Sequence, residues 1–212
     1  MKRYFLLITV MMFSLSCLSQ ELVNISLPAP NKKGGKPLME ALNDRQTKRD
    51  FSPQKLTEQQ LSDLLWAAFG INRPESGRRT APSAVNWQET DIYVSLESGV
   101  YLYDAKKNEL TAIISGDHRK DMGKQSFAGE AAVMLVFVAD YSKMGAVTPK
   151  ENKDLYSAVD AGYISQNVYL YCASENMSTV VLGMIDRDKI KQLLKLKEDQ
   201  KVILSQCVGF PK

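Results

Sequence analysis

Arg45-Gln46-Thr47-Lys48-Arg49-Asp50-Phe51 is the first of two stretches that together decide the fold of this chain. The second is Ala81-Pro82-Ser83-Ala84-Val85-Asn86-Trp87-Gln88. In the first stretch Arg45, Thr47 and Arg49 occupy alternate positions. Guanidinium groups suit bidentate contacts with phosphate oxygens, and a hydroxyl adds one more donor. Basic runs are usually solvated surface, so the first stretch taken alone gives only weak support for a phosphate site.

The second stretch has the features of a loop before a strand, because Pro82 and Ser83 interrupt regular structure. Ser83, Asn86 and Gln88 offer neutral donors and acceptors that suit the polar edge of a flat ligand. The alternative is an ordinary turn in which these side chains bond to nearby backbone, and for the loop taken alone this alternative is favoured.

Between the two stretches the sequence predicts an amphipathic helix that starts after Thr57 and ends at Gly70. Residues 57–60, Thr-Glu-Gln-Gln, have the form of a capping box, and Leu56 and Leu61 occupy the positions of a hydrophobic staple. Apolar residues then recur at helical spacing, at Leu61, Leu64, Leu65 and Ala68.

The rest of the chain mixes strands and helices without an internal repeat, which indicates an α/β or α+β class. We expect strands at residues 91–96, 99–104, 109–114, 131–139 and 201–208. The fourth is an unbroken apolar run, typical of a central strand covered on both faces. We expect further helices from Leu38 towards Arg45, over residues 157–176, and after Asp186 as N-cap. The helix over residues 157–176 is nearly uncharged, which predicts a place in the core or at a subunit interface.

The first nineteen residues have the three-part layout of a secretory signal peptide. Lys2 and Arg3 precede an apolar run, and small residues follow it up to Ser19. We expect cleavage after Ser19 and a periplasmic or secreted protein. Lipidation at Cys17 is a less favoured alternative, because the residues before it match the lipoprotein box poorly, and a buried N-terminal strand or helix is another. Residues 20–37 are then expected to form an extended leader, rich in proline and glycine, before a domain over residues 38–212.

Composition argues against several classes of function. Loss of residues 1–19 removes two basic residues, so the excess of basic over acidic residues falls from +3 to +1, which gives no support for a nucleic-acid partner. No later stretch has the apolar length of a membrane span, so we expect no transmembrane span in the mature chain. One histidine cannot build a typical zinc site. Cys172 and Cys207 lie in apolar runs typical of buried thiols, with a disulfide as the alternative in an exported protein.

In this order and spacing, the two motifs resemble the nitroreductase family. The matching positions are Arg45, Thr47, Arg49 and Phe51, then Ala81, Pro82, Ser83, Asn86 and Gln88. The preceding Arg78-Arg79-Thr80 is similar to the branch that includes the thiazoline and oxazoline dehydrogenases. The resemblance covers about residues 38–212: residues 160–170 are similar to the family's long core helix, and residues 208–211 to its closing strand and turn.

The resemblance implies an α+β fold with a central, mostly antiparallel sheet flanked by helices and an FMN site at a homodimer interface. Nine residues would contact FMN: Arg45, Thr47, Arg49 and Lys212 at the phosphate and ribityl chain, Pro82, Ser83 and Asn86 along the isoalloxazine ring, and Leu182 and Gly183 through their backbone. The flavin carries out the hydride transfer through its N5 atom, and the protein positions it. No acid, base, nucleophile or metal ligand is therefore predicted.

Two positions depart from the family pattern. Glu89-Thr90 stands where the family commonly has Pro-Trp, and the chain stops at Lys212, where many relatives carry a basic residue beyond this ending. The expected function is an exported FMN-dependent oxidoreductase with a small organic substrate and a separate electron donor or acceptor. The alternative is a non-catalytic protein that binds flavin or another planar ligand on the same scaffold.

Overall fold

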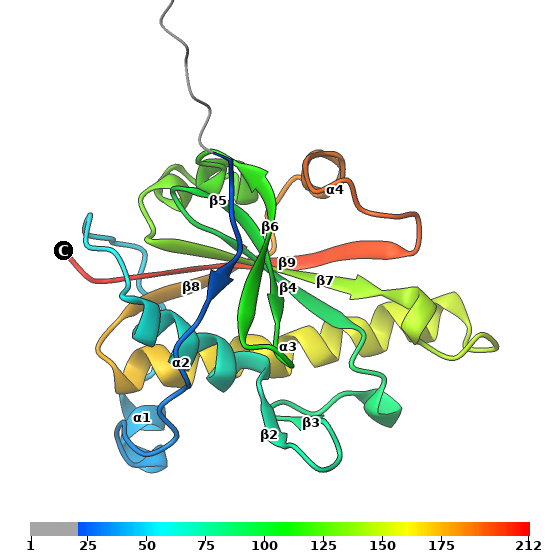
Figure 1. The fold of residues 1–212 in the computed structure, drawn as a ribbon, viewed down its shortest axis with the longest axis horizontal. Helices are drawn as coiled ribbons and strands as arrows, with labels where there is room; N and C mark the ends of the chain where they lie inside the picture. The colour runs from blue at the N-terminus through cyan, green and yellow to red at the C-terminus, as the bar shows by residue number, and fades with distance from the viewer. Residues whose placement is uncertain (1–20) are drawn as a thin grey trace, which may run out of the picture.

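The computed structural model describes residues 21–212, in which a seven-stranded sheet carries helices on both faces (Figure 1). The strand order is β1-β6-β5-β4-β7-β9-β8, and every neighbouring pair is antiparallel. The predicted α+β class with a mostly antiparallel sheet is therefore confirmed. The predicted signal peptide, with Cys17 and Ser19, lies outside the described residues.

The strands of the sheet are β1 (Ile25–Ser26), β4 (Thr90–Ser95), β5 (Gly99–Asp104), β6 (Glu109–Ser115), β7 (Val133–Asp140), β8 (Ser178–Leu182) and β9 (Gln200–Gly209). A separate hairpin consists of β2 (Ile71–Arg73) and β3 (Arg78–Arg79). The α-helices are α1 (Leu38–Asp44), α2 (Glu58–Phe69), α3 (Lys150–Ser174) and α4 (Arg187–Leu193). Short 3-10 helices are η1 (Ala84–Asn86), η2 (Arg119–Met122), η3 (Ser126–Gly129) and η4 (Tyr141–Lys143).

Strand β7 lies inside the sheet, with β4 on one side and β9 on the other. Side chains alternate between the two faces of a strand, so an unbroken apolar run is needed where both faces are covered. Leu135 and Phe137 pack into the core beneath α2 and α3, whereas Met134 and Val136 pack into the core beneath α4, η2 and η3. Figure 1 shows α3 and α4 on opposite sides of the sheet. The prediction of a central strand covered on both faces is confirmed.

Helix α2 starts and ends as its sequence predicts. The Thr57 hydroxyl accepts a hydrogen bond from the Gln60 amide at 3.2 Å, and the Gln60 side chain accepts from the Thr57 amide at 3.0 Å. At the other end, the Gly70 amide donates to the Trp66 carbonyl at 2.8 Å. These bonds satisfy backbone groups that a helix end leaves without an intrahelical partner.

Three segments are more regular than the sequence predicts. Within the leader, Ile25 pairs with Leu110 to place β1 at the edge of the sheet. The polar stretch of residues 72–80, in which the sequence gives no strand pattern, contains part of the β2–β3 hairpin. Helix α3 begins at Lys150 rather than near Ser157, directly after Pro149. Its first turns carry charged, exposed side chains, so they lack the periodic apolar pattern that predicts a helix.

Both remaining cysteines, Cys172 and Cys207, are buried free thiols, as their apolar surroundings predicted. The two thiols do not form the disulfide that was the alternative prediction. Across residues 21–212, no helix has the length and apolar character needed to span a bilayer.

Replacing the N-cap of α2, as in Thr57→Ala, is expected to lower the free energy of unfolding by about 1 kcal/mol, because the Gln60 amide loses its acceptor. Chemical denaturation would measure the change. Thr57→Ser keeps the hydroxyl and serves as the matched control. Equal losses in the two variants would show that the cap bond adds nothing to stability.

Candidate functional site

The first motif, residues 45–51, runs beside strand β8, which is one edge of the sheet. The Lys48 amide donates to the Thr179 carbonyl at 3.1 Å. An edge strand presents backbone groups that no neighbouring strand occupies, and the motif takes one of them. This contact places the motif alongside the strand that ends at Leu182 and is followed by Gly183.

The Tyr169 hydroxyl joins the first motif, helix α3 and strand β8. It lies 3.1 Å from the Thr47 hydroxyl and accepts a hydrogen bond from the Val181 amide at 3.0 Å. The Tyr169 ring also lies beneath the Arg45 guanidinium, 5.5 Å from the ring centroid. Tyr169 is buried, so its ring and hydroxyl hold a fixed position for these contacts. No motif in the sequence points to this residue.

The two guanidinium groups of the first motif remain available to an anion. Arg45 stacks on a ring but forms no ion pair with any residue of the described chain, and Arg49 is exposed with no hydrogen bond or ion pair to residues 21–212. Arg45 lines a cavity of about 430 Å³ together with Gln46 and Lys48. Arginine donors that no carboxylate occupies suit the phosphate that the sequence predicts here.

Leu182, Gly183 and Lys212 have different surroundings. Leu182 is buried, whereas Gly183 is exposed and a side chain built on it would come no closer than 3.9 Å to Leu204. Lys212 pairs with Glu130 at 3.0 Å, and its amide donates to Asp50 at 3.3 Å. Exposed ion pairs of this kind are weak, so the Lys212 ammonium can exchange its partner for a ligand phosphate.

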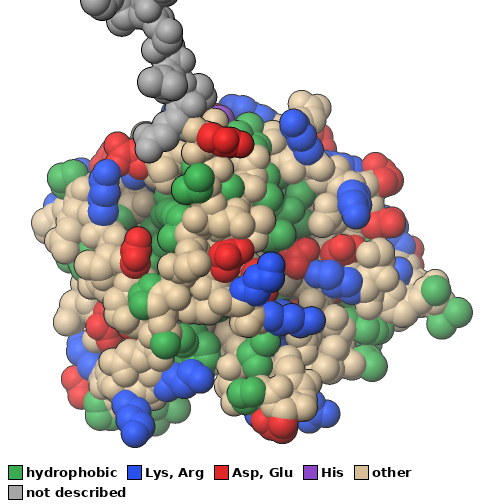
Figure 2. All heavy atoms as spheres, viewed as in Figure 1, with side chains coloured by type: hydrophobic (Ala, Val, Ile, Leu, Met, Phe, Trp, Pro, Cys, Tyr) green, Lys and Arg blue, Asp and Glu red, His purple; other side chains and the backbone are tan. Residues whose placement is uncertain are grey.

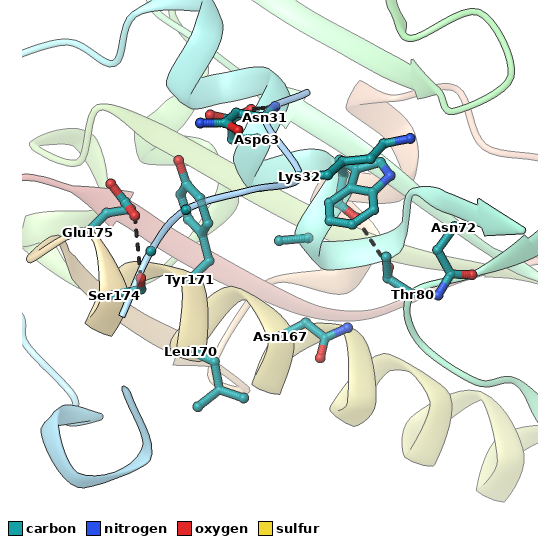
Figure 3. Close-up of a pocket in the computed structure, with 14 residues that line it drawn as sticks. Asn31, Lys32, Asp63, Asn72, Thr80, Asn167, Leu170, Tyr171, Ser174 and Glu175 are labelled. Carbon is teal, nitrogen blue, oxygen red and sulfur yellow. Dashed lines mark hydrogen bonds between the residues drawn. The ribbon is translucent and has the colours of Figure 1, made fainter. Parts of the chain in front are cut away.

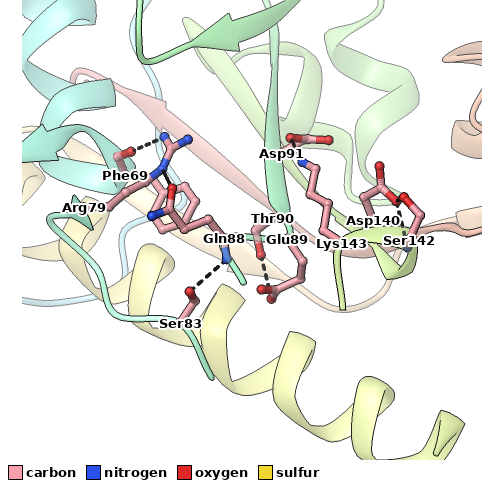
Figure 4. Close-up of polar contacts among 10 residues, drawn as sticks. All are labelled: Phe69, Arg79, Ser83, Gln88, Glu89, Thr90, Asp91, Asp140, Ser142 and Lys143. Carbon is pink, nitrogen blue, oxygen red and sulfur yellow. Dashed lines mark hydrogen bonds and ion pairs between the residues drawn. The ribbon is translucent and has the colours of Figure 1, made fainter. Parts of the chain in front are cut away.

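The second motif forms a loop around η1, and some of its polar side chains form hydrogen bonds within the loop (Figure 4). The Ser83 hydroxyl accepts from the Gln88 amide at 3.0 Å, and Arg79 donates to the Gln88 side chain at 2.8 Å. Arg79 also donates to the Phe69 carbonyl at 2.9 Å, which ties the loop to the end of α2. For Ser83 and Gln88 the ordinary turn alternative therefore accounts for the bonds observed. Pro82 and Asn86 remain exposed.

The loop backbone is strained at its exposed tip. Val85, Asn86 and Gln88 have φ values of 52°, 58° and 50°. A positive φ is unusual for a β-branched residue, and the Val85 side chain is also 82% exposed, so no contact within the chain explains it. Strained conformations of this kind cluster at ligand sites, where the surroundings hold them in place.

Two buried acids, Glu89 and Asp160, lie behind this loop, and no motif in the sequence gives either of them a role. Asp160, on α3, accepts a hydrogen bond from the Ala84 amide at 2.9 Å. Glu89 comes directly before β4, and its side chain lies above α3 in Figure 4. Burial raises the pKa of the Glu89 carboxyl to about 7, and burial also raises the pKa of Asp160.

The two motifs contact the same helix at different points. The first motif meets α3 at Tyr169 and the second meets it at Asp160. At a rise of 1.5 Å per residue, nine residues separate these contacts by about 14 Å along the helix. The structure thus brings Arg45, Thr47 and the end of β8 together, and keeps Pro82, Ser83 and Asn86 at a second location.

Another pocket lies between the leader, α2 and α3 (Figure 3). It has a volume of about 470 Å³. Several of its polar groups already have partners: Asp63 accepts from the Asn31 amide at 2.6 Å, Ser174 from the Lys36 amide at 2.7 Å, and Thr80 donates to the Trp66 carbonyl at 3.2 Å. These bonds fasten the leader and the loop before the second motif to the helices, so the pocket is a seam between packed segments.

One face of α3 is apolar but not covered. Ile164 and Val168 are fully buried against the sheet, as expected for part of the core. On the opposite face Leu155, Val159 and Tyr163 are 58%, 41% and 47% exposed. Helix α1, which packs beside the C-terminal part of α3, exposes three more large apolar side chains, Leu38, Met39 and Leu42. Elsewhere on the surface, Figure 2 shows acidic and basic side chains interspersed.

Comparison with known proteins gives the family. The sequence profile of the nitroreductase family matches residues 42–210. The chain belongs to the nitroreductase family. The match includes both motifs and strands β8 and β9, and it ends two residues before Lys212.

Relatives cover most of this nitroreductase-family chain. A nitroreductase-like protein of Ralstonia eutropha has a crystal structure that superposes with a TM-score of 0.85 at 41% identity, covering 89% of this chain and 90% of that one. A nitroreductase-like protein of Methanocaldococcus jannaschii is 30% identical over 171 residues, 76% of this chain and 85% of the relative. An NADPH-flavin oxidoreductase of Vibrio harveyi is 30% identical over 113 residues, 50% of this chain and 44% of that protein. These likenesses identify the chain as a nitroreductase-family oxidoreductase.

Tyr169→Phe removes the hydroxyl that joins Thr47 and Val181 but keeps the ring beneath Arg45. We expect the free energy of unfolding to fall by about 1 kcal/mol, because the Val181 amide and the Thr47 hydroxyl lose a hydrogen bond. We also expect faster hydrogen exchange at the Lys48 and Val181 amides. Tyr171→Phe is the control, since it removes a hydroxyl bonded to the Gln60 carbonyl at 3.2 Å. Equal protection of the Lys48 and Val181 amides from hydrogen exchange in both variants would show that the Tyr169 hydroxyl does not hold the first motif against β8.

Proposed function

We propose that this protein is an FMN-dependent oxidoreductase that transfers two electrons to or from a small organic molecule. The observation that carries the proposal is the cluster of Arg45, Thr47 and the end of β8 around Tyr169. It combines donors for a phosphate with an open strand end beside Gly183. The likeness to an NADPH-flavin oxidoreductase supports a flavin as the ligand, and the arginines favour its phosphorylated form.

The residues present fit FMN in both parts of the candidate site. Arg45, Arg49 and Thr47 would hold the phosphate and ribityl chain, with Lys212 as a further cation. Pro82, Ser83, Asn86 and the backbone of Leu182 and Gly183 would line the ring. When bound, the flavin supplies hydride transfer at its N5 atom. The protein's own residues bind and orient it, and we assign no side chain the role of acid, base or nucleophile.

The acting unit is proposed to be a homodimer. Helices α3 and α1 both expose large apolar side chains, and exposed apolar surface marks interaction sites. The face borders the pocket of Figure 3, since Asn167 and Leu170 of α3 line that pocket. A second copy packed here would bring its own motifs close to this helix.

We further propose export, on the strength of residues 1–19. An exported enzyme lies outside the cytoplasmic NAD(P)H pool, so another electron donor, or oxidation of the organic substrate with a separate acceptor, is part of the proposal. The resemblance of Arg78-Arg79-Thr80 to the thiazoline and oxazoline dehydrogenase branch favours the second direction. Within the chain, Arg79 supports the loop through Gln88 rather than facing a substrate.

The purified protein is expected to be yellow, or to become yellow with added FMN, and to be bleached by dithionite and reoxidised by an added acceptor. Absorbance spectra measure each step. A protein that binds no FMN would contradict the proposal. A flavin that binds but is not reoxidised by any small acceptor would favour the alternative, a non-catalytic flavin-binding protein.

Arg45→Ala combined with Arg49→Ala is expected to weaken FMN binding by about 3 kcal/mol in total, or about a hundredfold in Kd, because charge-assisted bonds to the phosphate are lost. Quenching of flavin fluorescence measures Kd. Lys106→Ala combined with Lys107→Ala, in the exposed turn between β5 and β6, removes the same net charge and serves as control. An equal loss of FMN affinity in both double variants would show that the effect comes from net charge and not from contacts of Arg45 and Arg49.

Val159→Glu combined with Tyr163→Glu is expected to convert a dimer into a monomer, because charges would replace the apolar surface of α3. Sedimentation velocity measures the mass. Val147→Glu is the control, since this residue is 96% exposed in the loop before α3. A wild-type protein that sediments as a monomer would sink the dimer proposal.

A further inference from the structure

The loop of residues 83–88 needs an external support, because its own conformation is unfavourable. Its positive φ angles at Val85, Asn86 and Gln88 are held although Val85 makes no packing contact that would repay the strain. Most of the bonds of this loop are internal or reach the β2–β3 hairpin, such as that from the Gln88 side chain to the Gly77 carbonyl at 3.1 Å. The Ala84 amide is the backbone group of the loop that reaches helix α3, where Asp160 accepts it.

Asp160 is itself held by a second acid. Asp160 and Glu89 are 3% and 0% exposed, and their carboxyl groups are close enough for the charge of Asp160 to raise the pKa of Glu89. Glu89 Oε2 has no hydrogen-bond partner among the described residues, and Oε1 receives only a long bond of 3.4 Å from the Thr90 hydroxyl. Two buried carboxylates in contact repel each other, so one of them keeps its proton and donates it to the other.

We propose that Asp160 and Glu89 are positioning residues that share one proton. Glu89 donates a hydrogen bond to Asp160, and Asp160 fixes the Ala84 amide. The pair thereby holds the 83–88 loop in the shape that binds the flavin ring. The part that concerns the flavin rests on the proposed function. Glu89 stands where the family commonly has proline, so the device belongs to this chain's own sequence.

The pair makes the loop sensitive to pH. Burial first, and then the charge of Asp160, raise the pKa of Glu89 to about 7 from its ordinary 4.5. Between these two values the folded chain holds a proton that the unfolded chain has lost, so the stability due to this proton falls as pH rises. Above about pH 7 both carboxyls are charged, and the support of the loop weakens.

Other titrating groups around the pair do not replace this effect. From η4, the Tyr141 hydroxyl donates to Asp154, and burial raises the pKa of Tyr141 to about 12, so it stays neutral. On α3, Lys150 pairs with Asp154 at 2.5 Å and Lys153 donates to the Tyr141 carbonyl at 3.1 Å. Both ammonium groups are thus directed to other partners. The single histidine, His118, contacts Asp121 at 3.2 Å and the Ser115 carbonyl at 3.1 Å instead.

The test compares wild type, Glu89→Gln and Asp160→Ala between pH 5 and 8.5. Without flavin, the denaturation midpoint of the wild type should fall more steeply with pH than that of Glu89→Gln, which keeps the shape of the side chain but carries no titrating proton. FMN affinity of the wild type should fall about tenfold from pH 6 to 8.5, the effect of one charge-assisted bond, and remain nearly constant in Glu89→Gln. Asp160→Ala should weaken FMN at every pH.

Asp154→Asn is the matched control. It removes another carboxylate of α3, whose pKa is lowered by its bond to Lys150 and which therefore stays charged throughout this range. Its pH response should equal that of the wild type. Identical pH slopes in wild type and Glu89→Gln would overturn the shared proton. A steeper wild-type slope in a protein that never binds FMN would support the pair and refute the proposed function, so the two failures are distinguishable.

Discussion

The contact of helix α3 with both motifs is the constraint on which the rest of the candidate site depends. Tyr169 and Asp160 project from the buried side of one rigid helix. The Tyr169 hydroxyl contacts the Thr47 hydroxyl of the first motif, and Asp160 accepts a hydrogen bond from the Ala84 amide of the second. Because the helix is packed against the sheet through residues such as Ile164 and Val168, neither contact can shift without disturbing the core. The spacing of the two motifs is therefore fixed by the length of helix between them.

This arrangement has an energetic consequence for α3. A helix that places Asp160, Ser157 and Ser165 in the interior gives up apolar contacts at those positions and must satisfy each polar group. Asp160 finds the Ala84 amide and a second carboxyl. The helix also leaves apolar residues on its outer face, a pattern that is unfavourable for an isolated monomer but reasonable for a face that packs against another copy. The buried polar residues and the exposed apolar residues of α3 both make the packing of a single chain less favourable than an apolar inner face and a polar outer face would.

The features that could be predicted from sequence are those whose cause is local. The capping box of Thr57 and Gln60 satisfies helix ends with residues three positions apart, and the apolar run of β7 reflects burial on two faces. Both were confirmed. The contacts of Tyr169 and Asp160 could not be predicted in the same way, because their partners lie 122 and 76 residues away. In the sequence these two residues are an ordinary tyrosine and aspartate within a long helix. The hairpin of residues 71–79 was missed for a related reason, since polar residues without alternation give no strand signal.

Glu89 shows how a departure from a family pattern can change the chemistry of a site without changing the fold. Proline at this position would fix φ and carry no charge, so the following strand and the preceding loop would be held by covalent geometry. Glutamate at the same position leaves the backbone free and adds a buried acid, which destabilises the folded chain unless it is neutral or paired. Its contact with Asp160 provides the pairing and at the same time connects the loop to the protonation of the interior. The strain at Val85 is then maintained by a hydrogen-bonded pair, and such a support responds to solution conditions in a way that a proline ring does not.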